Sequence, residues 1–103
     1  MVTYPVSVRR DGYRGKDARK KRKAADFNEI AAAVENYVNG LLYEQQEPVR
    51  SYGYNEIASA LGYDVKAVRD VGFSIDGGHN GFTAYKRGMT ATQALDAIRP
   101  EGL

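Results

Sequence analysis

The side chains with the clearest chemical potential in this sequence are nine basic residues gathered between positions 9 and 23. This stretch holds only two acids and carries +7, so the remainder of the chain carries −5 of the overall +2. Lysine and arginine at this density bind phosphate groups and release the counterions condensed around a nucleic acid. The candidate phosphate contacts at its end are Arg19, Lys20, Lys21, Arg22 and Lys23.

A stretch of this charge repels itself and offers little apolar surface to bury. We therefore expect residues 1–23 to form a flexible basic arm ahead of a folded domain over residues 24–103. Two other interpretations stay open, namely a solvated tail that aids solubility and an address signal in residues 20–23. Ahead of the basic stretch, the alternation in residues 3–8 predicts a short strand that Pro5 would confine to a sheet edge.

A second group of candidate residues lies in residues 54–73, where two short amphipathic helices are expected around Gly62. Ala58 is small enough to let the two helices approach closely, and Gly62 can adopt the positive φ that ends the first helix. Val68 and Val71 lie three residues apart, on one inward face of the second helix. A helix held in this way leaves its other face free for binding.

The outward arc of this second helix, residues 64–72, carries Lys66, Ala67, Arg69 and Asp70. Arg69 is the best candidate for a bidentate contact with guanine, and a surface ion pair with an aspartate is the alternative. Asp64 precedes the helix and suits an N-cap.

Tyr63 lies in the turn before this helix, where it either packs on the helix or reaches a phosphate. Its position alone does not separate the two roles.

The element that supports this pair is a long helix expected from residues 24–26 to about Gln46. Apolar residues recur in it at three- and four-residue spacing, which predicts one buried stripe. They are Phe27, Ile30, Ala31, Val34, Tyr37, Val38, Leu41 and Leu42. A core helix is the first interpretation, and a dimer helix is the alternative. Pro48 ends the helix, and residues 49–51 follow as a very short strand.

After the helix pair, residues 73–75 and 82–85 each alternate in the manner of strands. The glycines and the Asn-Gly pair between them predict a hairpin. His79 and Asn80 would lie at its tip, either as DNA contacts or as ordinary turn residues. Lys86 and Arg87 leave the hairpin and suit phosphate contacts, with a solvated strand end as the alternative.

The end of the chain predicts one more helix. Thr90 and Gln93 have the spacing of a capping box, and the helix should run to about Arg99 before Pro100 ends it. Its apolar residues Ala94, Leu95 and Ile98 are expected to face inward against the first helix. A surface for a partner is the alternative.

Taken in order, residues 27–87 resemble the winged helix-turn-helix family. The resemblance rests on Pro48-Val49-Arg50-Ser51-Tyr52, Glu56-Ile57-Ala58, Leu61-Gly62-Tyr63, Val68, Val71 and the expected hairpin. It implies a mainly helical fold with a small β-hairpin, a long N-terminal helix, a C-terminal helix and a flexible basic arm. It also implies DNA binding, with the second helix in the major groove and the hairpin on the backbone or in the minor groove.

One feature departs from this pattern. Asp64 and Asp70 nearly cancel Lys66 and Arg69, so the helix that should read DNA is close to neutral. Some winged helices bind proteins instead. A protein–protein interaction module of this fold is therefore the alternative function.

The composition argues against several other classes. The chain has no cysteine and one histidine, and it has no glycine-rich loop of phosphate-binding form, so we expect no enzyme activity, cofactor or metal site. No apolar run approaches the roughly 20 residues that a membrane span needs, and the N-terminus lacks a signal peptide's apolar segment. We expect a cytoplasmic, nucleoid-associated protein, or a nuclear one in a eukaryotic host.

The function expected from the sequence is sequence-specific DNA binding, in the role of a transcriptional regulator. Residues 64–72 would enter the major groove, while the wing of residues 73–87 and the basic arm would contact the backbone. The expected partner is double-stranded DNA, with a homodimer as a further prediction and no membrane.

Overall fold

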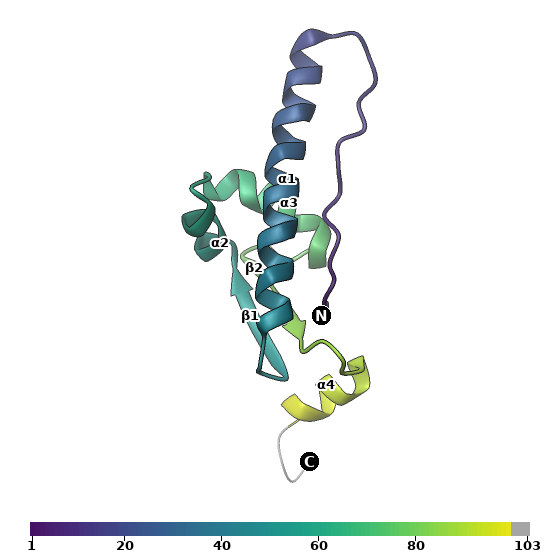
Figure 1. The fold of residues 1–103 in the computed structure, drawn as a ribbon, viewed down its shortest axis with the longest axis vertical. Helices are drawn as coiled ribbons and strands as arrows, with labels where there is room; N and C mark the ends of the chain where they lie inside the picture. Colours follow the sequence, from purple (N-terminus) through teal and green to yellow (C-terminus); the bar gives the residue numbers. More distant parts are fainter. Residues whose placement is uncertain (100–103) are drawn as a thin grey trace.

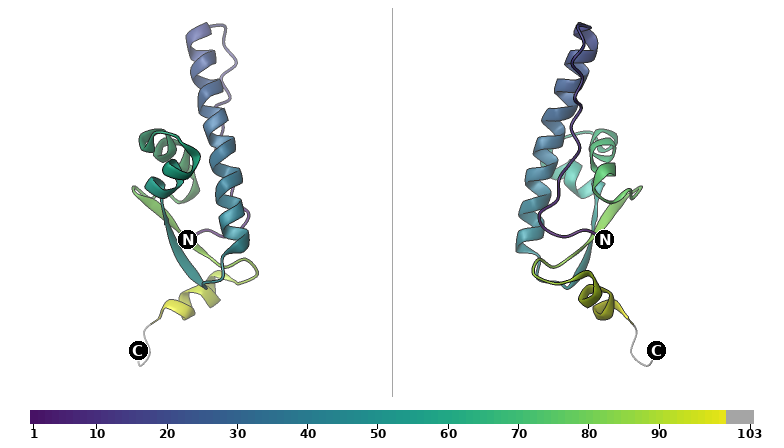
Figure 2. Two further views of the ribbon diagram at one scale, coloured as in Figure 1. Left: turned by 60° about the vertical axis from the view of Figure 1, so that its left-hand side comes forward. Right: turned by 90° about the vertical axis from the view of Figure 1, so that its right-hand side faces the viewer.

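A helix of 27 residues, α1 (Ala18–Glu44), forms the long axis of the molecule (Figure 1). The computed structural model describes residues 1–99. The other elements are β1 (Val49–Gly53), α2 (Tyr54–Leu61), α3 (Val65–Asp76), β2 (Gly81–Tyr85) and α4 (Ala91–Ile98). The protein is mainly helical, with one small two-stranded antiparallel sheet. It measures 59 × 25 × 22 Å, because the first turns of α1 project beyond α2, α3 and the sheet at one end and α4 lies beyond the sheet at the other (Figure 2).

The start of α1 differs from the sequence prediction. The helix begins at Ala18 instead of at residues 24–26, and the Asp17 carboxylate caps it by accepting hydrogen bonds from the N–H groups of Arg19 and Lys20. Lysine and arginine are good helix formers once a cap and a continuing helix are present. The prediction of a flexible arm is therefore wrong for residues 18–23, which are helical.

Residues 2–13, here called the strap, run in extended form alongside α1 (Figure 1). Two asparagine side chains of α1 bind the backbone of the strap. Each side-chain amide accepts from the N–H and donates to the carbonyl of one strap residue, as a neighbouring strand does in a β-sheet. Asn39 accepts from the Val6 N–H at 2.8 Å and donates to the Val6 carbonyl at 3.0 Å. Asn28 does the same with Asp11, at 2.7 and 2.9 Å. The strap is thus fixed to the helix by side-chain-to-backbone hydrogen bonds.

The middle of the strap contributes to the core. Val6 and Val8 are buried, and the Val8 N–H donates to the Glu35 carboxylate at 2.8 Å. Arg10 pairs with the same carboxylate at 3.2 Å. The hydrogen bond from Val8, followed by the contacts of Arg10, holds the pKa of Glu35 below its ordinary value, although partial burial opposes this. Residues 1–23 are therefore not an independent arm.

The strap forms only one bridge to the sheet, where a short strand over residues 3–8 was predicted. The Val2 N–H donates to the Thr83 carbonyl, and the Tyr85 N–H donates to the Val2 carbonyl. The Thr3 hydroxyl also donates to the Tyr85 carbonyl at 2.9 Å, and beyond it the strap leaves the sheet and follows α1. The β2 edge is covered there by the start of the chain.

The partner of β2 corrects the predicted hairpin. β2 pairs with β1 in antiparallel fashion, with Val49 opposite Tyr85 and Gly53 opposite Gly81. Residues 73–75 are not a strand, because α3 continues to Asp76 and ends at Gly77. Ile75 is buried four residues after Val71, so this segment follows the helical period of the inward face. The predicted hairpin over residues 73–87 is therefore wrong.

The hydrophobic core lies where the lower half of α1 meets α2, α3 and the sheet. The most deeply buried large side chains are Tyr54, Leu42, Ile57, Val34, Val38, Val68 and Val71. The predicted stripe of α1 is confirmed as a core face. A dimer helix stays a prediction, and the inner face of α1 is occupied by the protein's own core.

One buried polar side chain joins α1 to the sheet. Gln45 donates to the carbonyls of Glu47 and Ala84 and accepts from the Tyr52 hydroxyl at 2.8 Å. All of its hydrogen-bonding groups are used, so its burial carries no large desolvation penalty. The end of α1 is thereby fixed against β1 and β2.

The last helix is capped as predicted but packs differently. Thr90 and Gln93 form the capping box. Ala94 is buried, whereas Leu95 and Ile98 are 52% and 55% exposed, so the prediction that they face inward is wrong. The main packing partner of α4 is β1 instead of α1, because the chain leaves β2 at the far end of the sheet. Pro100 lies outside the described residues.

Over residues 1–99, no helix combines the length and the apolar character needed to cross a membrane.

Candidate nucleic-acid interface

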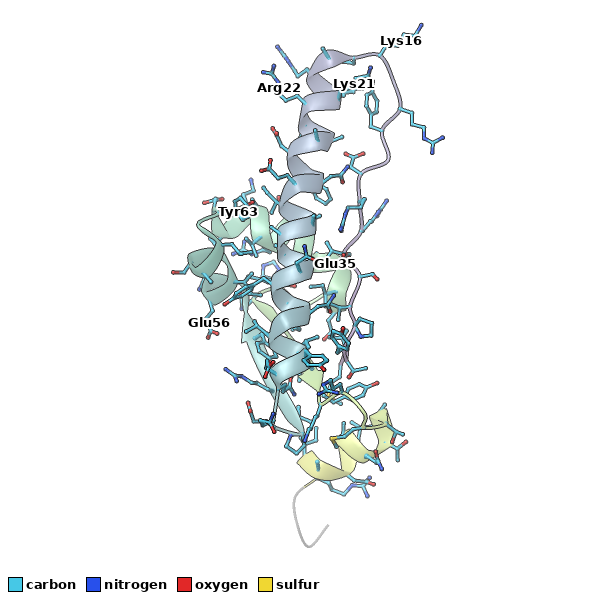
Figure 3. All side chains as sticks on the ribbon, viewed as in Figure 1. Lys16, Lys21, Arg22, Glu35, Glu56 and Tyr63 are labelled. Carbon is cyan, nitrogen blue, oxygen red and sulfur yellow. The ribbon has the colours of Figure 1, made fainter. Side chains whose placement is uncertain are left out.

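The basic residues gather at the projecting end of the molecule. Residues 14–23, here called the antenna, comprise the loop before α1 and its first turns. Figure 3 shows Lys16, Lys21 and Arg22 at this end. All seven basic side chains of the antenna are exposed, namely Arg14, Lys16, Arg19, Lys20, Lys21, Arg22 and Lys23. Its single acid, Asp17, serves as the helix cap, so the antenna carries a net +6.

Local contacts order the antenna without an apolar core. The Tyr13 hydroxyl accepts from the Asp17 N–H at 3.3 Å, and the Tyr13 N–H donates to the Asp11 carboxylate at 3.0 Å. The Lys20 ammonium lies 6.0 Å from the centre of the Tyr13 ring. The positive end of the α1 dipole coincides with these cations, so the repulsion between them is not relieved locally. A bound anion would relieve it.

The helix pair α2–α3 has the geometry that the sequence predicts. Ala58 is 4% exposed, and Gly62 ends α2 with φ 74°. Val68 and Val71 are buried on the inner face of α3. Asp64 caps α3 by accepting from the Lys66 N–H. The turn at Gly62, the inward face of α3 and the Asp64 cap are confirmed, and Ala58 is buried as a close approach of the two helices requires.

A contact that sequence reasoning missed locks the two helices together. The Tyr54 hydroxyl donates to the Gly72 carbonyl at 2.9 Å, and the tyrosine is 1% exposed. A Cβ at Gly72 would lie 2.6 Å from Cε1 of the Tyr54 ring, so only glycine fits there. Burial, together with the nearby negative charge of Asp76, raises the pKa of the Tyr54 hydroxyl. The phenol stays protonated and keeps its hydrogen bond.

The free face of α3 carries few exposed charged side chains that could contact DNA. Lys66 and Asp70 are exposed, and Phe73 is 56% exposed. Ala67 and Arg69 are only half-exposed, and the Arg69 Nε is enclosed without a hydrogen-bond partner among residues 1–99. Within the same part of the chain, Arg69 forms no ion pair with an aspartate.

The strap brings two arginines beside this face. The Arg9 N–H donates to the Ser74 hydroxyl of α3 at 3.1 Å. An open groove of about 540 Å³ lies between the strap, α1 and α3. It is lined by Arg9, Arg10, Asp11, Gly12, Phe27, Asp70, Val71, Phe73 and Ser74. Cationic side chains therefore flank the near-neutral α3.

The sequence prediction missed this groove for two reasons. The alternation of residues 73–75 predicts a strand instead of an exposed helical position for Phe73, and no local pattern indicates that residue 9 contacts residue 74. The density of arginine near residue 9 was visible in the sequence, but its destination was not.

The other predicted site residues lie around the rest of the fold. Tyr63 is half-buried and packs against the core. His79 and Asn80 are exposed in the loop between α3 and β2, where the Asn80 carbonyl accepts from the Tyr54 N–H. They are loop residues at the start of β2, not the tip of a hairpin.

Lys86 and Arg87 follow β2 and lie at the opposite end of α1 from the antenna. The Lys86 N–H donates to the Pro48 carbonyl. The Arg87 guanidinium lies 4.0 Å from the centre of the Tyr43 ring, and its Nε donates to the Tyr43 carbonyl. At about 1.5 Å per residue, Tyr43 is roughly 35 Å along the helix from Lys20. The structure therefore brings the strap beside α3, whereas Lys86 and Arg87 lie far from the antenna.

Neither the chemistry of the groove nor that of the antenna resembles a metal centre. Among residues 1–99, no three histidine, aspartate or glutamate side chains are grouped as ligands. No family model, no curated protein and no solved structure matches this chain.

Proposed function

We propose that this protein binds DNA, with α2 and α3 as a helix-turn-helix pair and the antenna as its phosphate-binding element. The observation that carries the proposal is the antenna. Seven exposed cations surround the positive end of a helix dipole, and none of them forms an ion pair within residues 1–99. An arrangement of this kind favours the binding of a polyanion.

The α2–α3 pair supports the same function. Its turn at Gly62, the close approach at Ala58 and the free outer face of α3 are what a recognition helix in the major groove requires. Of the elements on which the sequence's resemblance to winged helix-turn-helix proteins rests, β1, α2 and α3 support the proposal. Since β2 pairs with β1, backbone contacts would come from the strap and the antenna in place of a wing.

The division of labour follows from the charges. The near-neutral face of α3 adds little non-specific attraction, whereas each phosphate neutralised by the antenna contributes about 0.9 to the slope of log affinity against log salt. Sequence preference would then depend on Lys66 and Arg69 at base edges. A transcriptional regulator is the role that combines these two properties.

The test measures binding to one mixed-sequence duplex by fluorescence anisotropy over a series of salt concentrations. The double variant Lys20→Ala/Lys21→Ala should flatten the salt slope by about 2. The control Arg50→Ala/Arg99→Ala removes the same charge from β1 and from the end of α4 and should keep the slope. Absence of duplex binding by the wild type, or equal slopes for both variants, would contradict the proposal.

Sequence specificity needs its own measurement. On a duplex selected by the wild-type protein, Arg69→Ala should cost about 1–3 kcal/mol, while binding to random duplexes should change little. Equal weakening of both would remove Arg69 from base reading.

A protein-interaction module is the second candidate, because Phe73 is 56% exposed on a near-neutral helix. Exposed aromatic side chains are enriched where proteins meet. This candidate predicts that the wild type does not bind duplex DNA at low salt, so the same titration separates the two functions.

A further inference from the structure

We propose that the groove between the strap and α3 holds one unpaired nucleobase, so that the protein prefers DNA with an extrahelical base to a fully paired duplex. The inference rests on the proposed function and names the form of DNA that the site takes. It assigns a role to the groove, which a helix-turn-helix contact alone leaves unused.

Two aromatic rings from different elements line the groove. Phe27 comes from α1 and packs partly on the core, while Phe73 comes from α3 and is 56% exposed. What distinguishes Phe73 from the other exposed apolar side chains is its place in the groove, beside Arg9 and Asp70. Nucleobases stack on aromatic rings whatever their sequence, which makes a base a suitable partner.

The polar walls of the groove match the edge of a base. Arg10 is engaged by Glu35 and the Val8 carbonyl. The guanidinium of Arg9 and the carboxylate of Asp70 have no hydrogen-bond or ion-pair partner within residues 1–99. An arginine donates to ring and carbonyl acceptors of a base, and a carboxylate accepts from its amino group. Guanine offers both kinds of group, whereas thymine has no amino group.

The position of the groove favours a nucleic acid over a peptide or a small molecule. Gly12 lines the groove, and the antenna begins two residues later at Arg14. A strand whose phosphates lie on the antenna is thus led along the strap to the groove. The groove has about 540 Å³ and is open to solvent, so a base can enter from the side while its phosphates stay in water.

The experiment compares three duplexes of about 20 base pairs at about 150 mM salt, by anisotropy with the full-length protein. One is fully paired, one carries a single unpaired guanine, and one carries a single unpaired thymine. We expect the wild type to bind the guanine bulge about tenfold more tightly than the paired duplex, with the thymine bulge weaker than the guanine bulge.

Two variants assign the preference to the groove. Phe73→Ala should remove the preference, so that the ratio of guanine-bulge affinity to paired-duplex affinity falls to about one. Asp70→Asn should reduce the difference between guanine and thymine. The control Leu95→Ala removes another exposed apolar side chain, which is 52% exposed on α4, and should keep the preference. Circular dichroism and the melting temperature show that each variant is folded.

The possible failures are distinct. If the wild type binds none of the duplexes, the proposed function fails and this inference fails with it. If it binds paired and bulged duplexes equally, or if Phe73→Ala keeps the preference, only this inference is overturned. If Phe73→Ala converts a dimer to a monomer in sedimentation, the groove is a contact between copies, which also overturns it.

Discussion

The two ends of α1 are held in different ways. Its lower half buries Val34, Val38 and Leu42 in an apolar core shared with α2, α3 and the sheet. Its upper end, from Asn28 to the antenna, is paired with the strap by hydrogen bonds that are exposed to water. We call the lower half of α1, together with α2, α3 and the sheet, the body of the molecule. The difference shows that the apolar core of the body stabilises the fold, while the basic charge lies in the antenna, which contributes no side chain to this core.

This separation has a physical basis. Like charges four residues apart on a helix, such as Arg19 and Lys23, destabilise it slightly. A short helix alone is marginal in water. The first turns of α1 therefore depend on their continuity with the body and on the Asp17 cap. A cluster of cations is tolerated there because the body supplies the stability.

The largest expected change in the free energy of unfolding comes from replacing a glycine of α3 by alanine, and the same substitution in α1 is its control. Gly72→Ala should destabilise the protein by about 3 kcal/mol, because its Cβ would lie 2.6 Å from the buried Tyr54 ring. Gly40→Ala in α1 should stabilise it by about 1 kcal/mol, since that Cβ would meet no atom within 4 Å other than its own chain neighbours and the local helix backbone. Urea denaturation measures both. An unchanged midpoint for Gly72→Ala would show that α2 and α3 are not locked at this point.

The need for glycine at position 72 shows which features of the fold can be predicted from the sequence and which cannot. Ala58, Gly62 and Val68 were predictable, because helix turns and apolar periods are local signals. The closeness of Tyr54 to Gly72 was not, since it depends on how two helices cross. The segment 73–75 misled for a related reason. A run of three alternating residues fits both the two-residue period of a strand and the 3.6-residue period of a helix. Only the end of α3 at Gly77 shows that this segment is helical.

The strap was the hardest part to predict. Asparagine and glutamate on the long helix are ordinary solvated residues by pattern, and their backbone partners lie 17 to 33 residues away. The candidate site was likewise predictable only where its residues are close together in the sequence. The antenna was visible as a charge cluster, whereas the groove exists only because the strap returns beside α3.

The second prediction compares the two asparagine pairs. Asn39→Ala should cost about 1–2 kcal/mol, because it leaves the partly buried N–H and carbonyl of Val6 without partners. Asn28→Ala should cost less than about 0.5 kcal/mol, because water replaces its exposed bonds to Asp11. Thermal denaturation of the two variants provides the measurement. Equal losses would mean that the antenna end of the strap is as structural as the body end.

The third prediction concerns pH. The pKa of Glu35 is lowered in the fold, so its carboxylate contributes stability above its unfolded pKa, near 4.5, and loses that contribution as the pH falls through the folded value. The effect should be about 1 kcal/mol or less, because the group is partly exposed.

The variant Glu35→Gln isolates this contribution. Its stability deficit relative to the wild type should be present at pH 6 and should shrink below pH 4.5. A deficit that stays constant across this range would assign the role of Glu35 to packing instead of charge.

The smallest expected change in stability belongs to the antenna itself. In the variant Lys20→Gln/Lys21→Gln, both substituted side chains are exposed and neither forms an ion pair among residues 1–99. Removing their repulsion should raise the free energy of unfolding by no more than about 0.5 kcal/mol, since lysine and glutamine have similar helix propensities. Chemical denaturation at low and high salt measures this change, and the small gain should disappear at high salt, where the repulsion is screened. A loss above about 1 kcal/mol would show that the lysines stabilise the fold. The antenna would then be a structural part of the body, and the contrast between the two ends of α1 would no longer hold.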